Sequence, residues 1–249
     1  MIGYMNAVIL AAGRGERLRP LTDTTPKCLT LVGGRPILEY ELDALEAAEI
    51  KECTIVVGYR DSQIIEHFGP SFKHLTLDYV RNPDYATTNN LYSLWLARDY
   101  LQSQTILIEG DLLFCSELIA KLVNAHATDI AVVDKFREDM NGTIVRGHGA
   151  MISEFVLKSA QGENFDFSGV VKTVNLYKFS KLTMCEHFLP GLSRYVGKQN
   201  TDIFYEAVLA ELVSEKSLQM EMMFPGECPW FEIDTQKDLR IAEELFRAP

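Results

Sequence analysis

The first 135 residues alternate short apolar segments with stretches of helical periodicity. Each apolar segment is brief or rich in β-branched residues, as expected of strands buried on both faces. Such strands are predicted at 7–10, 54–57, 75–79, 105–108 and 130–133. Helices are predicted at 36–48, 62–68, 90–101 and 116–125, the first with Leu38, Leu42 and Leu45 on one face. This alternation predicts a parallel sheet covered by helices.

The pattern changes after residue 135, where glycines separate short β-prone segments. Antiparallel ribbons are predicted from 143–145, 151–157 and 170–177, and helices from 182–195 and 203–214. An extended segment at 230–234 and a helix at 238–246 follow, and Thr235 and Asp238 have the spacing of a capping box. No repeat or low-complexity linker divides the chain, so we expect a single domain over residues 1–249.

The composition narrows the functional classes. The 249 residues carry a formal net charge of −11 and a pI of about 5.0, which disfavours broad binding to nucleic acid or anionic membranes. The five cysteines are widely spaced and form no C-x-x-C motif, so we expect reduced thiols rather than a disulfide framework or zinc site. No apolar run approaches the ~18 residues of a membrane span, and residues 7–12 lack a basic leader. We therefore expect a cytoplasmic protein without signal peptide or membrane anchor.

A glycine-rich loop follows the first predicted strand. Residues 7–12 are apolar and lead directly into Gly13-Arg14-Gly15. Small residues after a buried strand leave backbone N–H groups free to surround phosphate oxygens and allow close approach. Residues 11–27 hold four basic and two acidic side chains, so this segment is positively charged although the whole chain has a net negative charge. The loop is therefore predicted to bind a polyphosphate; a glycine turn with solvated arginines is the structural alternative.

Other well-known motifs do not fit this chain. A dinucleotide-binding G-x-G-x-x-G would need glycine where Leu18 stands, and no P-loop sequence follows any glycine. The five histidines are scattered, with neither H-E-x-x-H nor a nucleophile-elbow motif. Zinc chemistry and triad hydrolysis are therefore disfavoured.

The loop resembles the signature of nucleotidyltransferases that activate small phosphorylated compounds, L-A-A-G-x-G-x-R-L followed by P-K, here at 10–18 and 26–27. The strings at 88–94, 140–143, 172–180 and 230–234 are similar to those of bacterial cytidylyltransferases that act on phosphocholine or on phosphonates such as 2-aminoethylphosphonate. The resemblance implies an α/β, Rossmann-like nucleotidyltransferase fold with a mostly parallel central sheet and a β-rich acceptor-binding lobe. Residues of about 1–135 would then bind the nucleotide and those of about 136–249 the acceptor.

Carboxylates suited to a Mg²⁺ cofactor stand at two places in the sequence. Asp111 follows the strand at 105–108, at the end where open α/β sheets bind ligands, and the resemblance implies that it ligates the metal. Glu232 and Asp234 alternate along the extended segment and can project from one face. The alternatives are a helix cap for Asp111 and a helix start for Asp234. Asp134 is a minor candidate for the same site.

The predicted reaction is attack by an acceptor phosphate or phosphonate oxygen on the α-phosphorus of CTP, with release of pyrophosphate. The nucleophile is already an anion, so the obstacle is to bring two polyanions together. The predicted catalytic residues, which neutralise the triphosphate, are Lys27 and Arg17. The predicted nucleotide-binding residues are Leu10, Ala11, Ala12, Gly13, Arg14, Gly15, Asn82, Tyr85, Thr88, Asn89 and Gly110. The candidate acceptor-binding residues are Lys172, Asp139, Tyr92 and Trp230.

Two other functions stay open on the sequence alone. A sugar-1-phosphate nucleotidyltransferase that uses UTP or dTTP would carry a similar loop, and a non-catalytic nucleotide sensor could share the fold. The expected partners are CTP and a small phosphonate or phosphate ester, with neither nucleic acid nor membrane. A homodimer is possible.

Overall fold

The structure is a computed structural model that describes residues 5–246. The strands of the first half are β1 (Met5–Ala11), β2 (Leu31–Val32), β3 (Arg35–Pro36), β4 (Glu52–Val57), β5 (Ser71–Phe72), β6 (Leu75–Arg81), β7 (Gln104–Glu109) and β8 (Leu112–Phe114). Those of the second half are β9 (Ile130–Lys135), β10 (Ile144–His148), β11 (Met151–Val156), β12 (Val171–Phe179), β13 (Glu221–Met223) and β14 (Trp230–Glu232). The α-helices are α1 (Ile37–Ala47), α2 (Asp61–Phe68), α3 (Asn90–Leu96), α4 (Ser116–Asn124), α5 (Leu189–Gly197), α6 (Glu206–Ser214) and α7 (Gln236–Leu245).

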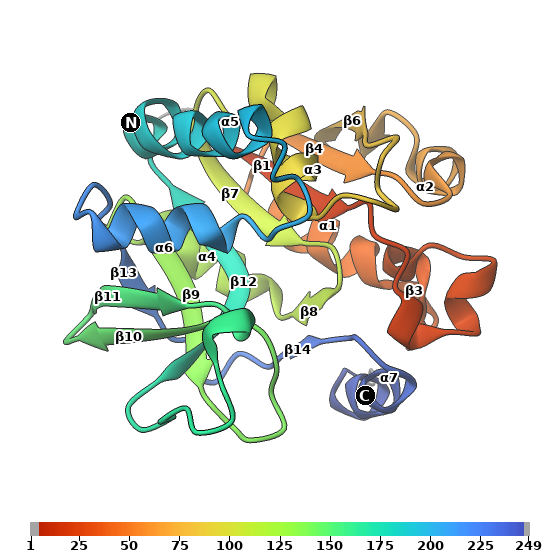
Figure 1. Cartoon of the computed structure of the whole chain (residues 1–249). Coiled ribbons are helices and arrows are strands. Elements are labelled where there is room, and N and C mark those ends of the chain that lie inside the picture. Colours follow the sequence, from red (N-terminus) through yellow and green to blue (C-terminus); the bar gives the residue numbers. More distant parts are fainter. Residues whose placement is uncertain (1–4, 247–249) are drawn as a thin grey trace.

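Within residues 5–246, ten of these strands form one sheet in the order β10-β11-β13-β9-β12-β7-β1-β4-β6-β5 (Figure 1). Its centre is the parallel set β6-β4-β1-β7. The buried side chains form two large clusters, one on each face of the sheet. One contains residues of α1, α2 and α4, and the other residues of α3, α5 and α6. The predicted α/β class and the five predicted strands of the first 135 residues are confirmed.

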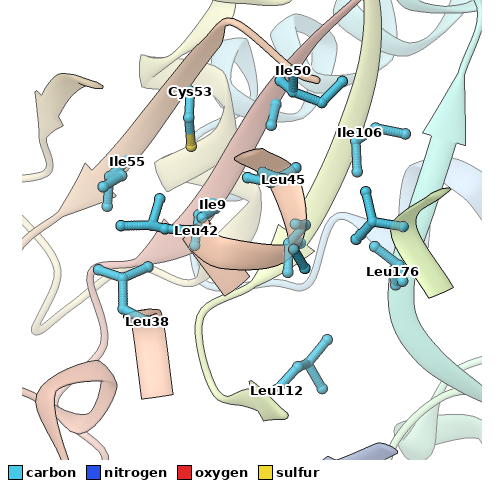
Figure 2. Packing of buried hydrophobic residues seen from close by; sticks show 14 of the residues in the cluster. Ile9, Leu38, Leu42, Leu45, Ile50, Cys53, Ile55, Ile106, Leu112 and Leu176 are labelled. Atoms are coloured by element: carbon cyan, nitrogen blue, oxygen red, sulfur yellow. The ribbon is translucent and has the colours of Figure 1, made fainter. Parts of the chain in front are cut away.

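Strand β1 shows why the sheet is buried on both sides. Ala7 and Ile9 pack in the cluster under α1, whereas Val8 packs in the opposite cluster because successive strand residues point to opposite faces. Leu38, Leu42 and Leu45 of α1, the stripe predicted from the sequence, are fully buried. Figure 2 shows this stripe against Ile9 and Ile55 of the sheet. Burying each such side chain contributes about 1.5–3 kcal/mol.

The second half departs from the simple parallel order. Strand β12 inserts between β7 and β9 and runs antiparallel to both, so it separates β9 from the parallel set β6-β4-β1-β7. Strands β10 and β11 form the predicted antiparallel ribbon. The helix predicted at 182–195 begins as a π-helical segment at Thr183–Phe188 and continues as α5. The helix predicted at 203–214 begins only at Glu206, because backbone groups of Thr201 and Ile203 accept hydrogen bonds from the start of α3.

A small ribbon outside the large sheet joins β8 to β14. The strands are antiparallel, with Phe114 opposite Trp230 and Leu112 opposite Glu232. Helix α7 begins directly after it, and the predicted capping box of Thr235 and Asp238 is confirmed. Within residues 5–246, no helix is both long and apolar enough to cross a bilayer.

The structure corrects the expectation of reduced thiols at one pair. Cys115 and Cys228 lie beside each other at one end of the β8–β14 ribbon and form a disulfide, with their Cα atoms 5.7 Å apart. They are 113 residues apart in the chain. The pairing of β8 with β14 brings them together, and the spacing of the cysteines in the sequence does not reveal that pairing. In the described part of the chain Cys28, Cys53 and Cys185 are free.

Reduction of the Cys115–Cys228 disulfide is expected to lower the free energy of unfolding by about 2–4 kcal/mol, because the bond restricts the unfolded chain. Urea denaturation with and without dithiothreitol measures this difference. The Cys115→Ser/Cys228→Ser protein should match the reduced parent, and Cys185→Ser should respond to reduction as the parent does. Equal stability of the oxidised and reduced parent would contradict the prediction.

Candidate functional site

A cavity of about 720 Å³ opens at the carboxyl ends of β1 and β7. Ligands of open α/β sheets bind at this edge. The lining includes the first loop and the turn after β7, together with segments of the second half that lie far away in the sequence. These second-half residues are Asn141, Gly142, Thr143, Leu157, Lys158, Ser159, Asn175, Asp202, Ile203, Phe204, Glu206, Ala207, Glu232 and Asp234.

The glycine-rich loop has the shape of an anion cradle. Leu10, Ala11, Ala12, Gly13 and Gly15 line the cavity. Gly15 has a φ of 68°, and a Cβ on it would lie 2.9 Å from Cβ of Lys27, so only glycine fits here. A Cβ on Gly13 would meet no atom within 4 Å. The loop therefore leaves room beside its backbone for a ligand.

The three predicted metal-ligating carboxylates lie together although they come from distant parts of the sequence. The β8–β14 ribbon aligns them, since the Ile233 N–H donates a 3.0 Å hydrogen bond to the carbonyl oxygen of Asp111. Ile233 is fully buried, and its neighbours Glu232 and Asp234 line the cavity. One carboxylate oxygen of each acidic residue lies within 4.8 Å of the others. The strand alternation expected from the sequence therefore produces a cluster of three carboxylates.

Lys27 pairs with two of the three carboxylates. Its Nζ donates to Asp111 Oδ2 at 2.6 Å and to Asp234 Oδ1 at 2.7 Å. Burial alone would lower the pKa of Lys27, but these two carboxylates raise it above its ordinary value. Burial would raise the pKa of Asp234, and Lys27 holds it below its ordinary value. Arg17, largely exposed, adds an ion pair to Asp234 at 2.8 Å. The two predicted cationic residues therefore meet the predicted metal site.

The carboxylate cluster fits a hard divalent cation. Asp111 Oδ1 is buried and has no hydrogen-bond partner among the described residues, so it has a free lone pair for a ligand. Mg²⁺ takes oxygen ligands, usually one or two carboxylates with phosphates and water. Burial raises the pKa of Glu232 to about 7, and Lys172 acts in the opposite direction. Asp111, Asp234 and Glu232 could therefore hold Mg²⁺ beside the cradle.

Lys172 lies next to Glu232 on the side away from the cavity. Its side chain is almost completely buried, and its Nζ donates to the Thr173 carbonyl oxygen at 2.6 Å and lies 3.7 Å from Glu232 Oε2. It is absent from the residues that line the cavity. In this arrangement Lys172 neutralises Glu232, and direct contact with an acceptor stays a prediction.

The loop at 82–89, predicted to read the base, is partly at the cavity. Tyr85, Thr88 and Asn89 line it. Asn82 is buried behind them, where its Nδ2 donates to Thr88 Oγ1 at 3.1 Å and to Ser93 Oγ at 2.9 Å. Asn89 also caps α3 through the Asn90 N–H, so the capping alternative holds for that residue. Asn82 thus anchors the loop. Thr88 and Asn89 line the cavity although the Thr88 hydroxyl and the Asn89 amide oxygen already have partners within the chain.

Besides Asn82 and Lys172, four predicted residues lie outside the cavity lining. Arg14 packs over the Tyr59 ring with 5.4 Å between its Cζ and the ring centroid, and Tyr92 stacks on Trp95 of the same helix. Trp230 Nε1 donates to Asp134 Oδ2 at 2.7 Å. Asp134, the minor candidate for a metal ligand, therefore has Trp230 as its partner. Asp139 is exposed and pairs with Arg137. Tyr92, Trp230 and Asp139 have these partners away from the cavity, and Arg14 lies against Tyr59 although its buried Nε has no hydrogen-bond partner among the described residues.

Several lining residues were not predicted as site residues. Glu109 directly follows the strand predicted at 105–108. Phe204 and Glu206 belong to the helix predicted at 203–214, and Asp202 directly precedes it. The acidic residues Asp202 and Glu206 near the beginning of that helix were the feature of the sequence that could have indicated a binding site there. Asn141, Gly142 and Thr143 stood in a string that carried the resemblance, but no role was assigned to them.

Comparisons with known proteins agree with this geometry. The family model described as the MobA-like NTP transferase domain matches residues 7–164. The chain is 31% identical over 246 residues to the CMP-5'-(3-aminopropyl)phosphonate synthase of Streptomyces rubellomurinus, which covers 98% of this chain but only 39% of that protein. It is 27% identical to the choline-phosphate cytidylyltransferase of Streptococcus pneumoniae, over 98% of this chain and 99% of that enzyme.

Solved structures give the same result for the fold. The CTP:phosphocholine cytidylyltransferase of Streptococcus pneumoniae superimposes with a TM-score of 0.75 and 25% identity, over 97% of this chain and 99% of that one. A UDP-glucose pyrophosphorylase superimposes with a TM-score of 0.80 but 15% identity, over 99% and 98% of the two chains, and therefore shows the fold alone. The predicted Rossmann-like nucleotidyltransferase fold is confirmed. The chain belongs to the family of MobA-like NTP transferase domains and is a nucleotidyltransferase.

Proposed function

We propose that the protein transfers CMP from CTP to a small phosphonate or phosphate ester and releases pyrophosphate, with Mg²⁺ as cofactor. The observation that carries this proposal is that one cavity contains the glycine cradle, Lys27 and the carboxylates of Asp111, Glu232 and Asp234. The relatives named as CMP-phosphonate synthase and choline-phosphate cytidylyltransferase support CTP as the donor.

The chemistry requires charge neutralisation more than proton transfer. An acceptor oxygen attacks the α-phosphorus of CTP, the bond from that phosphorus to the bridging oxygen breaks, and pyrophosphate leaves with the electron pair. Backbone N–H groups of the loop at 12–15 would hold phosphate oxygens, while Lys27 and Arg17 face their charge. Bound Mg²⁺, held by Asp111, Asp234 and Glu232, would neutralise further phosphate charge. The acceptor is already anionic, so no side chain has to act as a general base.

A substrate panel tests the proposal. Pyrophosphate release is measured with CTP, UTP, dTTP, ATP and GTP, each combined with 2-aminoethylphosphonate, 3-aminopropylphosphonate, phosphocholine or glucose 1-phosphate. CTP with a phosphonate or phosphocholine should give the highest kcat/KM. Faster turnover of UTP or dTTP with the sugar phosphate would replace the proposal by sugar activation. Binding of CTP without turnover of any acceptor would identify a sensor.

Replacing Gly13 by alanine is expected to raise KM for CTP about tenfold or more, because a methyl group would occupy the space where phosphate approaches the backbone. The protein itself should stay stable, since the added Cβ meets no atom within 4 Å and Gly13 does not need a positive φ. Steady-state kinetics and thermal denaturation check both parts. Gly197→Ala, at an equally open position in α5, is the matched control. An unchanged KM would show that the nucleotide does not lie against the loop.

A further inference from the structure

Helix α1 carries a glutamate on the face that packs into the core. Glu41 stands three residues after Leu38 and four before Leu45, so it lies on the same side of the helix as these leucines. Its side chain is fully buried, as theirs are. A carboxyl group is costly to bury unless it forms hydrogen bonds. A glutamate at this position therefore indicates a specific polar contact.

This contact is with the backbone that directly follows Asp111. Strand β8 and helix α1 lie side by side, with Leu112 close to the helix (Figure 2). Glu41 Oε1 accepts a 3.3 Å hydrogen bond from the N–H of Leu112, the first residue of β8. Glu41 Oε2 is buried and has no hydrogen-bond partner among the described residues. The side chain of Glu41 is thus directed at the peptide between Asp111 and Leu112.

The β8–β14 ribbon itself leaves this N–H without a partner. Leu112 lies opposite Glu232, and the Ile233 N–H donates to the Asp111 carbonyl oxygen. In an antiparallel pair with this pattern, the N–H of Leu112 points away from the other strand. In the described part of the chain, β14 is the only strand that pairs with β8. A partner for the Leu112 N–H has to come from outside the ribbon, and Glu41 supplies it.

The peptide between Asp111 and Leu112 is consequently held from both sides. Its C=O accepts from β14, and its N–H donates to α1. The preceding residue is held as well, because the Gly110 N–H donates at 3.0 Å to the carbonyl oxygen of Leu10 in β1. These hydrogen bonds restrict the backbone of Asp111, and the backbone determines where its carboxylate points.

Helix α1 also supports the cationic partner of Asp111. It contacts the short helix Lys27–Leu29, whose first residue donates to Asp111. Cys28 of that helix packs in the same buried cluster as Leu38. Glu41 is absent from the residues that line the cavity. Any effect of Glu41 on the reaction therefore has to act through Asp111 and not through contact with a substrate.

We propose that Glu41 is a positioning residue of the metal site, which holds the Leu112 N–H and so directs the Asp111 carboxylate toward the divalent cation. This inference rests on the proposed function, since that function assigns Mg²⁺ to Asp111. Removing a group that orients a metal ligand typically weakens metal binding by about 10–100-fold.

The test compares two replacements of Glu41. Glu41→Leu fills the space without a hydrogen-bond acceptor, whereas Glu41→Gln keeps an oxygen at the same place. Burial raises the pKa of Glu41, and the charge of Asp111 acts in the same direction, so neutral glutamine is a close match. With Mg²⁺ alone, the concentration that gives half of the rise in Tm should increase about tenfold or more in Glu41→Leu and stay within about threefold of the parent in Glu41→Gln. The Mg²⁺ dependence of pyrophosphate release should shift in the same way.

A variant at Leu45 separates positioning from packing. Leu45→Val truncates another fully buried side chain about one turn further along α1. It should lower Tm without Mg²⁺ and leave the Mg²⁺ midpoint unchanged, because it removes packing but no hydrogen bond. Glu41→Met, with a more flexible side chain, takes the place of Glu41→Leu if that protein does not fold.

The outcomes separate this role from the proposed function. A folded Glu41→Leu protein with the parent's Mg²⁺ midpoint overturns the inference, and so does an equal shift in Glu41→Gln or Leu45→Val. If neither Glu41→Leu nor Glu41→Met folds while Glu41→Gln does, Glu41 is structural and the inference is also overturned. A parent protein whose Tm does not rise with Mg²⁺ overturns it as well. Absence of pyrophosphate release with every acceptor overturns the proposed function, whereas the Tm curves still decide the role of Glu41.

Discussion

Replacing Lys27 by methionine is expected to lower kcat/KM for CTP by roughly several hundredfold to a thousandfold. One unit charge about 4 Å from a phosphate oxygen, at an effective dielectric near 20, contributes about 4 kcal/mol, and each 1.36 kcal/mol corresponds to a factor of ten. The structure adds a second effect, because Lys27 donates to both Asp111 and Asp234. Its removal leaves carboxylates facing one another without their shared cation.

The two effects can be measured separately. Pyrophosphate release gives the catalytic loss, and thermal denaturation without Mg²⁺ gives the loss of stability. Because Mg²⁺ can replace the missing positive charge, it should raise Tm more in Lys27→Met than in the parent. Lys237→Met, an exposed lysine on α7, should match the parent in both measurements. Full activity of a folded Lys27→Met protein would show that Lys27 does not face the triphosphate.

The predictable parts of the site are those encoded in a continuous segment. The strand that ends at Ala11, the loop through Gly15 and the position of Lys27 follow from apolar runs, small residues and local charge within about twenty residues. Glu232 and Asp234 could be placed on one face from strand alternation alone. Their meeting with Asp111 was expected only from resemblance, since the ribbon that aligns them pairs segments more than 110 residues apart.

The parts that escaped prediction depend on long-range pairing. Insertion of β12 between β7 and β9 and the Cys115–Cys228 disulfide both arise from contacts that no local pattern records. Tyr92 and Trp230 were predicted to bind the acceptor, but a residue's type does not determine where its side chain points. Tyr92 faces Trp95, and Trp230 donates to Asp134. Glu206 was missed for the opposite reason, because a glutamate at the start of a helix is common on a solvent-exposed face.

Replacing Asp111 by asparagine is expected to cause a loss of activity as large as that of Lys27→Met. Asp111 is the carboxylate whose Oδ1 is buried without a partner, and its Oδ2 accepts from Lys27 at 2.6 Å. Asparagine keeps the shape but removes the charge, so the site should bind Mg²⁺ much more weakly and face the triphosphate with less neutralisation. We expect kcat/KM to fall by roughly a thousandfold, which corresponds to about 4 kcal/mol.

The dependence of rate on Mg²⁺ concentration distinguishes this role from a structural one. In the parent the rate should saturate, whereas in Asp111→Asn the half-saturating Mg²⁺ concentration should rise and high Mg²⁺ should restore part of the rate. The fold should persist, because Lys27 still donates to Asp234. Asp99→Asn, at an exposed aspartate near the opposite ends of the strands, should leave the Mg²⁺ curve unchanged. If Asp111→Asn kept the parent's Mg²⁺ curve and lost only stability, Asp111 would be a structural carboxylate and the ion would bind elsewhere.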